Sequence, residues 1–323
     1  MKGDSLPVLW ARGVVAALAA WKALLLALAL NAALAVVVTA PLASRLHDLL
    51  DARPAADGLA KGWDLVLGAH LLRAEPGLLG DRGRLAALER GDLPLAEAPR
   101  LSGPLGGLLA AGLVHVLLSG LLAGGFAGRF AAERDRGSLS AFLADAVRLG
   151  PSSVLVGAVG LAAILGAFRL LVELPREATL SPDLRWDWER TGLSLVRLGA
   201  FLVVTGAVRA FVAQSRAALG LAKSASPLAA LGAGLGFVLG RPVKALLLEL
   251  SFGVTALLPL AAWLLFAPSW SGGDPRLLAL LVAGQQAVVL LRISARAAHV
   301  GAASGWMRVA RETARPAPAK IET

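Results

Sequence analysis

The sequence predicts an all-α polytopic membrane protein with about six transmembrane helices, two interfacial elbow helices and both termini in the cytosol. Three observations lead to this prediction. Of the 323 residues, 57% are apolar and 17% are charged, whereas soluble domains carry about 25% charged residues. The apolar residues form runs long enough to cross a bilayer, which takes about 20 residues. Basic residues lie mainly in the segments that six spans would place on one side.

The chain starts with a basic segment followed by an uncharged apolar run. Lys2, Arg12 and Lys22 come before residues 23–42, which carry no charge. A signal peptide has an apolar core of about 7–15 residues, so we expect this run to stay as the first span. The alternative is cleavage within the small residues that follow it. Residues 1–43 are therefore the N-terminal segment and first span.

A long connection, residues 44–104, separates the first span from the rest. Apolar residues between Leu59 and Leu71 recur at helical spacing, which predicts an amphipathic helix. Prolines interrupt the segment at Pro54, Pro76, Pro94 and Pro99. We expect an extracytoplasmic amphipathic cap without a core of its own.

Five further apolar runs form the predicted helical membrane domain, residues 105–305. The runs are residues 105–128, the span after the first elbow that ends near 169–173, and residues 191–215, 245–267 and 276–298. The last segment, residues 306–323, is predicted to be a flexible cytoplasmic tail.

Two stretches predict elbows, each a helix on the membrane surface, a turn and a crossing helix. The turns are expected at Gly150-Pro151 and at Gly240-Arg241-Pro242, because proline suits the first turn of a helix. The order of elements over residues 105–174 recurs over residues 191–267, which suggests a parallel internal repeat. The alternative is that apolar helix–turn–helix units resemble one another without duplication.

The distribution of charge predicts the orientation. With six spans, the four main groups of basic residues fall on one side, of which Lys2, Arg12 and Lys22 are the first, and the loops of residues 174–190 and 268–276 on the other side are acidic or balanced. The basic groups after the first span are Arg129, Arg134, Arg136 and Arg148; Arg209, Arg216, Lys223, Arg241 and Lys244; and Arg292, Arg296, Arg308, Arg311, Arg315 and Lys320. The net charge of +10 therefore indicates cytosolic loops and not nucleic-acid binding. The Ala, Leu, Arg and Gly bias favours a bacterial inner membrane.

Glycines spaced four residues apart predict helix faces that another helix approaches closely. The expected packing residues are Gly112, Gly120, Gly124, Gly128, Gly232, Gly236 and Gly240. Besides the lipid bilayer, a protein partner or a second copy of the chain is the expected occupant of such faces.

Several polar side chains fall at similar depth near the predicted midplane. They are His115, Thr205, Thr255, Gln285 and Gln286. Polar groups in hydrocarbon are unfavourable unless paired, so we expect them to face inward. One interpretation is a polar layer that lines a solute path, with His115 as its titratable member. The other is that these side chains only form hydrogen bonds between helices.

Glu249 and Arg292 are the candidate intramembrane ion pair. They are expected at similar depth in the fifth and sixth spans, where pairing would offset the cost of burying either charge. The alternative is that both side chains extend to the membrane interface.

No catalytic motif is present, so the sequence predicts neither an enzyme nor a cofactor. The chain has no cysteine, and its four histidines lack metal-ligand spacing. The first hypothesis is a non-enzymatic inner-membrane protein, either a scaffold or a membrane subunit of a complex. The alternative is a transporter or permease for a small or amphiphilic solute, which would use the polar midplane layer.

Overall fold

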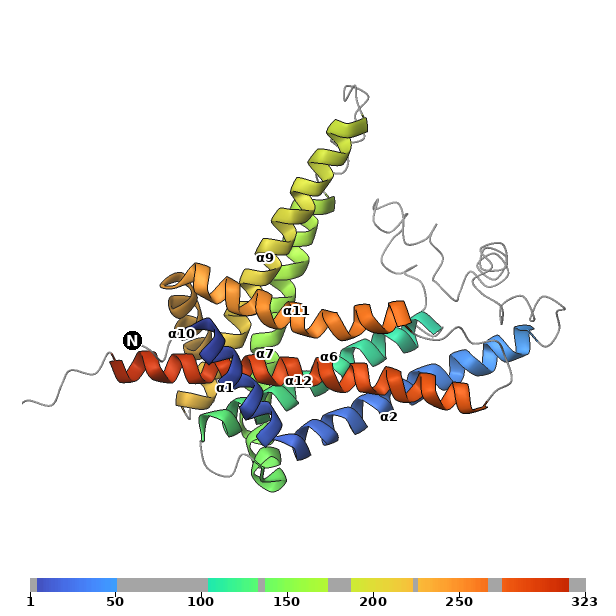
Figure 1. Cartoon of the computed structure of the whole chain (residues 1–323), viewed down its shortest axis with the longest axis horizontal. Helices are drawn as coiled ribbons and strands as arrows, with labels where there is room; N and C mark the ends of the chain where they lie inside the picture. Colours follow the sequence, from blue (N-terminus) through green and yellow to red (C-terminus); the bar gives the residue numbers. More distant parts are fainter. Residues whose placement is uncertain are drawn as a thin grey trace, which may run out of the picture. The chain divides into compact units, whose positions relative to one another are not determined.

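The computed structural model describes residues 5–50, 104–132, 137–173, 187–222, 226–266 and 275–313, and these residues are almost entirely helical (Figure 1). The helices are α1 Leu6–Ala19, α2 Trp21–Leu50, α6 Pro104–Ala131, α7 Leu139–Phe168, α9 Asp187–Ala222, α10 Pro227–Leu239, α11 Pro242–Phe266 and α12 Pro275–Thr313. A short π-helical segment, Arg169–Glu173, extends α7. Of the predicted cap, residues 44–104, the part from 51 to 103 lies outside the described residues, while residues 44–50 belong to α2 and Pro104 begins α6.

The described helices confirm an all-α polytopic membrane protein. Five of them are long and apolar enough to cross a membrane, and a sixth span results if the bent pair α1 and α2 counts as one. Local sequence explains where the helices begin. α6, α10, α11 and α12 each start at a proline, whose missing N–H has no partner in the first turn. Ser138 and Ser226 cap α7 and α10, because each hydroxyl accepts a hydrogen bond from the backbone N–H three residues later.

The chain forms two compact units. Unit 1 comprises Met1–Leu26, Ser119–Leu260 and Leu290–Thr323, and unit 2 comprises Ala27–Leu118 and Ala261–Val289. Unit 1 contains the main core of buried apolar residues, in which Leu9, Phe142, Leu248 and Trp306 are almost completely inaccessible. In unit 2, Gly284 of α12 faces the ring of Trp263, so a Cβ atom at Gly284 would overlap the indole.

The N-terminal segment contains a bend that the sequence analysis did not predict. The chain turns by 74° between α1 and α2, at Ala20. α1 then packs against α12, where a Cβ atom at Gly13 would overlap the carbonyl oxygen of Ala298. Small residues are needed at this crossing because the two backbones nearly touch. α1 therefore belongs to the core of unit 1.

Of the two predicted elbow turns, the structure contains one. α10 ends at Leu239 and α11 begins at Pro242, so the Gly240-Arg241 turn is where the sequence places it. The prediction of a turn at Gly150-Pro151 is wrong, because α7 continues through both residues as one helix. Proline in a helix interior removes a backbone hydrogen bond and costs about 3 kcal/mol in isolation, but packing in a membrane protein can offset this. Here Gly150 packs tightly on Leu121 of α6.

The two glycine rows have different surroundings. In unit 1, α6 presents Gly120, Gly124 and Gly128 to α7, and a Cβ atom at Gly124 would lie 2.6 Å from the backbone nitrogen of Gly150. On α10, by contrast, a Cβ atom at Gly232 or Gly236 would meet no atom of the described residues within 4 Å beyond its own helix backbone, and at Gly240 it would meet only carbonyls of its own helix. The α10 glycine that packs closely is Gly234, which lies against Ser215 of α9. A Cβ atom at Gly112, in unit 2, would likewise meet no other atom in the described part of the chain.

α12 extends into the segment where the sequence predicts a flexible tail. The helix continues to Thr313, and Trp306 is fully buried. Arg308 donates hydrogen bonds to the carbonyls of Phe130 (3.0 Å) and Ala131 (2.9 Å) at the end of α6. A cation is favourable there, because the last carbonyls of a helix lack partners within the helix.

Candidate functional site

The five predicted midplane residues are divided between the two units. His115 and Gln286 are half-buried and Gln285 is exposed in unit 2, whereas Thr205 and Thr255 belong to unit 1. Thr255 donates a hydrogen bond of 2.8 Å to the carbonyl of Ser251 in its own helix. The hydroxyl of Thr205 is buried and has no hydrogen-bond partner among the described residues. Neither unit therefore brings the whole set together.

In unit 1, charged and polar side chains lie instead around Glu249 of α11. Its carboxylate is almost completely buried, and Oε1 lies 2.6 Å from Nε of Arg209, a half-exposed residue of α9. Oε2 lies 3.1 Å from Nδ1 of His299 on α12, but outside hydrogen-bonding geometry. Three helices thus contribute to one charged cluster, which consists of Arg209, Glu249 and His299.

The predicted partner of Glu249, Arg292, forms no ion pair with it in the structure. Arg292 lies about two turns before His299 on α12 and so shares a face with that histidine. His299 occupies the position beside the carboxylate, and Arg209 reaches it from α9. The pairing in the structure therefore links α11 to two other helices.

Further arginines surround this cluster. Arg296 is within electrostatic range of Arg209 and Arg292, and Arg216 is within range of Arg296. Among the side chains that the structure describes, the acids are Asp145, Glu249 and Glu312. Since Asp145 has other partners and Glu312 lies at the end of α12, Glu249 is the described carboxylate that remains in this region. The cluster and the arginines around it together carry a surplus of positive charge.

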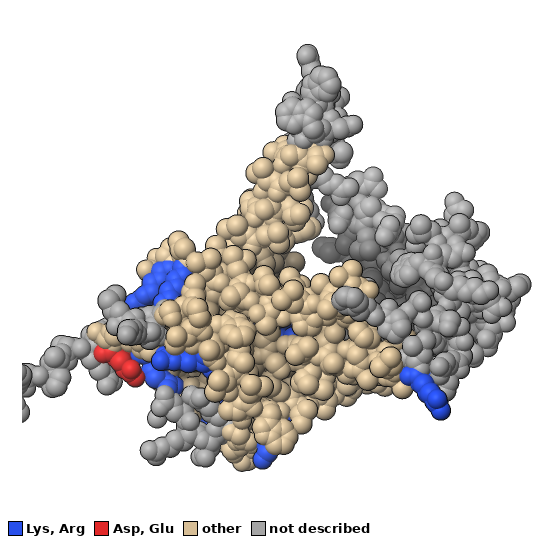
Figure 2. Space-filling view, in the orientation of Figure 1, with Lys and Arg blue, Asp and Glu red and all other residues tan. Residues whose placement is uncertain are grey.

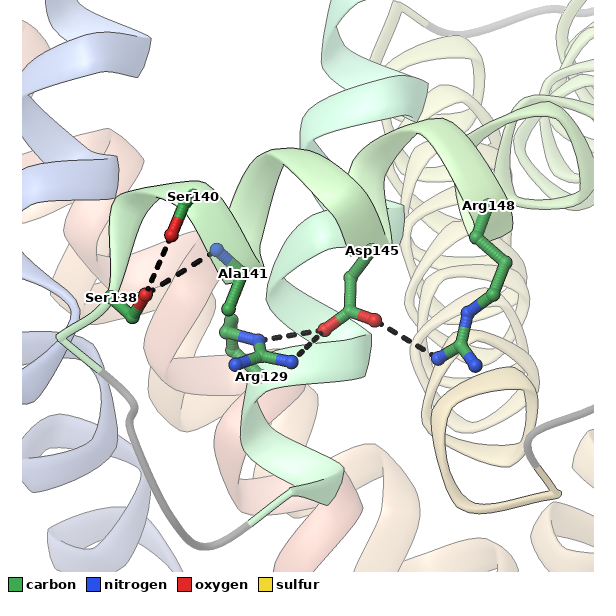
Figure 3. A network of polar contacts seen from close by, with 6 residues as sticks. All are labelled: Arg129, Ser138, Ser140, Ala141, Asp145 and Arg148. Carbon is green, nitrogen blue, oxygen red and sulfur yellow. Dashed lines mark hydrogen bonds and ion pairs between the residues drawn. The ribbon is translucent and has the colours of Figure 1, made fainter.

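A second buried ion pair connects α6 and α7 (Figure 3). Arg129 of α6 donates from Nε to Oδ2 of Asp145 at 2.7 Å, and Arg148 donates from Nη2 to Oδ1 at 2.9 Å. The side chains of Arg129 and Asp145 are 12% and 9% exposed, so water screens this pair little. Asp145 is not among the residues that the sequence predicted for a site. The signal available was a lone acid in a mainly apolar stretch.

Comparison with known proteins gives no family for this chain. No family model, curated protein or solved structure matches the chain. Function therefore has to be argued from the side chains themselves. The described residues also contain no group of three or more histidine and acidic side chains that would hold a metal ion.

The surface of unit 1 is basic near the cluster. Figure 2 shows Lys and Arg over the turn between α10 and α11 and along the C-terminal part of α12. At the turn, Arg241 is exposed, and Lys244 lies 4.9 Å from the ring centre of the buried Trp306. The local field therefore attracts anions toward this turn.

Chemically, the cluster can bind and neutralise negative charge. Guanidinium groups offer five donors each in a planar fork and have no acceptor. Several other buried side-chain atoms in unit 1 also lack hydrogen-bond partners among the described residues: Ser153 Oγ, Gln214 Oε1, Ser215 Oγ, Ser304 Oγ and Trp306 Nε1. Binding of an anion is the chemistry that this arrangement favours.

Proposed function

We propose that the chain is a transporter or permease for a small or amphiphilic anion. The observation that supports this proposal is the surplus of arginine over carboxylate around Glu249, inside helices that are long enough to cross a membrane. Charged residues in membrane helices are unfavourable, and in general they mark substrate paths or pair with one another. Here one carboxylate cannot pair with all of the arginines, which leaves capacity for a negatively charged solute.

The location of the cluster also favours transport. Arg209 belongs to α9, Glu249 to α11 and His299 to α12, so a bound anion would contact several helices at once. A movement of these helices relative to one another would then alter the affinity for the anion. Such coupling between binding and helix movement is what a carrier needs.

We further propose that the protein lies in a bacterial inner membrane with the basic end of unit 1 in the cytosol. The concentration of Lys and Arg at this end supports the orientation. We expect reporter fusions after Lys223 and after Thr323 both to report a cytosolic location. A periplasmic signal from either fusion would contradict the predicted orientation.

The transport proposal predicts anion flux through the purified protein. In proteoliposomes we expect uptake of at least one labelled anion from a panel of inorganic phosphate, a dicarboxylate and a short-chain phosphatidic acid. Replacing both Arg216 and Arg296 with Gln should lower the initial rate by about tenfold or more, which corresponds to about 1.4 kcal/mol of lost interaction. Initial rates are compared with those of protein-free vesicles.

The matched control is Arg311→Gln, which removes an exposed arginine near the end of the same helix, α12. This variant should transport at the wild-type rate. The proposal fails if none of the panel anions crosses faster than in protein-free vesicles, or if Arg311→Gln lowers the rate as much as the double variant.

The second candidate is a scaffold or membrane subunit. The observation in its favour is that both ion pairs tie helices together, Arg129 with Asp145 across α6 and α7 and Glu249 with Arg209 across α11 and α9. Close contacts at glycines also hold helices together. A protein that moves no panel anion in the assay above, and retains its fold when Arg216 and Arg296 are replaced, would favour this candidate.

A further inference from the structure

Two arginines of unit 1, Arg216 and Arg296, have no carboxylate partner among the residues that the structure describes. They belong to α9 and α12, which pack together through Ala213, Ala217 and Ala303. Arg216 and Arg296 are within electrostatic range of each other, and within the described part of the chain neither forms an ion pair. Like charges held together in an apolar region are unfavourable unless an anion lies between them.

The nearest carboxylate cannot supply that negative charge in full. Glu249 holds Arg209 at 2.6 Å through Oε1, and His299 lies 3.1 Å from Oε2. Arg296 has, besides Arg216, two more cations in range, Arg209 and Arg292. The field at Arg216 and Arg296 is therefore positive after Glu249 is taken into account.

The guanidinium of Arg216 has hydrogen-bond capacity that its described surroundings do not use. Its Nε atom is buried and has no hydrogen-bond partner among the described residues. The guanidinium lies beside Gly157 of α7, where a Cβ atom would be 2.8 Å from Nη2. One turn earlier on the same face of α7, the hydroxyl of Ser153 is fully buried and likewise without a hydrogen-bond partner. Glycine at position 157 thus leaves the space that the guanidinium occupies.

The two arginines differ in exposure. Arg216 is half-buried, whereas Arg296 is exposed. A ligand that approaches from the surface of unit 1 would therefore meet Arg296 first. The exposed apolar residues Leu161 and Leu165 of α7 and Leu202 of α9 would adjoin an acyl chain if the ligand carried one.

We infer that Arg216 and Arg296 bind the phosphate group of a ligand. The inference names the substrate class of the site proposed above and rests on the proposed transport function. A phosphate dianion neutralises two guanidinium groups, and its oxygens accept the paired N–H bonds that each fork presents. A carboxylate carries one charge and two oxygens, so it satisfies the pair less well. The phosphate comes from free inorganic phosphate or from a lipid headgroup.

Binding to two probes tests the inference and separates the two sources. The first probe is inorganic phosphate, titrated calorimetrically into the full-length protein in detergent. The second is phosphatidic acid, in nanodiscs of phosphatidylcholine with and without this lipid. We expect at least one probe to bind the wild-type chain, and we expect Arg216→Gln and Arg296→Gln each to weaken binding by about tenfold or more. Arg311→Gln should bind like the wild type.

Binding of phosphate alone indicates a soluble substrate, and binding of phosphatidic acid alone indicates a headgroup. Two further variants guard against misfolding. Arg216→Lys keeps the charge and loses the fork, and Gly157→Ala crowds the guanidinium without removing it. Both should bind more weakly than the wild type while their circular dichroism stays unchanged.

The inference is overturned if neither probe binds the wild-type protein, or if Arg311→Gln binds as weakly as Arg216→Gln. Its failure differs from that of the transport proposal. Phosphate binding without anion flux rejects transport and leaves the site in place. Flux of the dicarboxylate without phosphate binding rejects the phosphate site and leaves transport in place.

Discussion

Replacing Glu249 with Ala is expected to destabilise the protein by about 3 kcal/mol, because removing one member of a buried ion pair strands the other. The lower end of the usual range applies, since the side chain of Arg209 is 49% exposed and can be solvated in part. His299, whose side chain is 10% exposed, loses the same neighbour. Thermal unfolding in detergent, followed by circular dichroism, measures the change.

Two comparisons make this result specific. Glu312→Ala removes an exposed acid at the end of α12 and should leave the unfolding temperature unchanged. The double variant Glu249→Gln, Arg209→Gln should be more stable than Glu249→Ala, because it leaves no unpaired arginine at position 209. Equal stability of Glu249→Ala and the wild-type protein would contradict the ion pair.

Replacing Gly124 with Val is expected to cost about 3 kcal/mol or more, because overpacking a close helix contact forces the backbones apart. A Cβ atom at this position would lie 2.6 Å from the nitrogen and 2.7 Å from the Cα atom of Gly150, and neither backbone atom can move by a side-chain rotation. The contact between α6 and α7 should therefore open. The yield of monodisperse protein and its unfolding temperature report the loss.

The control lies on the same helix. A Cβ atom at Gly112 of α6 would meet none of the described residues outside its own helix backbone within 4 Å, so Gly112→Val should be tolerated with little change in unfolding temperature. Gly232→Val on α10 offers a second control for the same reason. If Gly124→Val and Gly112→Val were equally stable, α6 and α7 would not pack as the structure has them.

The spans could be predicted from the sequence because the bilayer sets a minimum length for an apolar run. Bends within such runs are harder to predict. The turn at Ala20 lies between two apolar helices and has neither glycine nor proline to mark it. At Gly150-Pro151 both residues are present, yet α7 continues. Tertiary packing decides both cases, and it is not visible in a local pattern.

The site was predictable only in part. A lone acid in an apolar run identifies Glu249, because a buried charge needs a partner. The identity of that partner depends on how the helices are rotated and which of them are neighbours. Depth alone suggests Arg292, whereas the structure selects Arg209 and His299. Asp145 was missed because its segment was expected on the membrane surface, where an acid needs no partner.

Glycine spacing also predicts only part of the helix packing. A repeat of four places glycines on one helix face, but it does not say whether another helix covers that face. A Cβ atom at Gly124 would meet the backbone of α7, whereas one at Gly236, at the same spacing in its own row, would meet no other helix among the described residues within 4 Å. The pattern therefore predicts the direction of a face and leaves its occupant open.

The burial of Trp306 gives the molecule an intrinsic optical probe. Its indole is fully inaccessible, lies edge-on to Phe237 at 4.8 Å between ring centres, and has Lys244 over its face. Trp10 and Trp21 are exposed, so dissolved or lipid-borne quenchers reach them first. The emission that survives quenching comes in part from Trp306, and its wavelength and lifetime follow the state of the core without any attached dye.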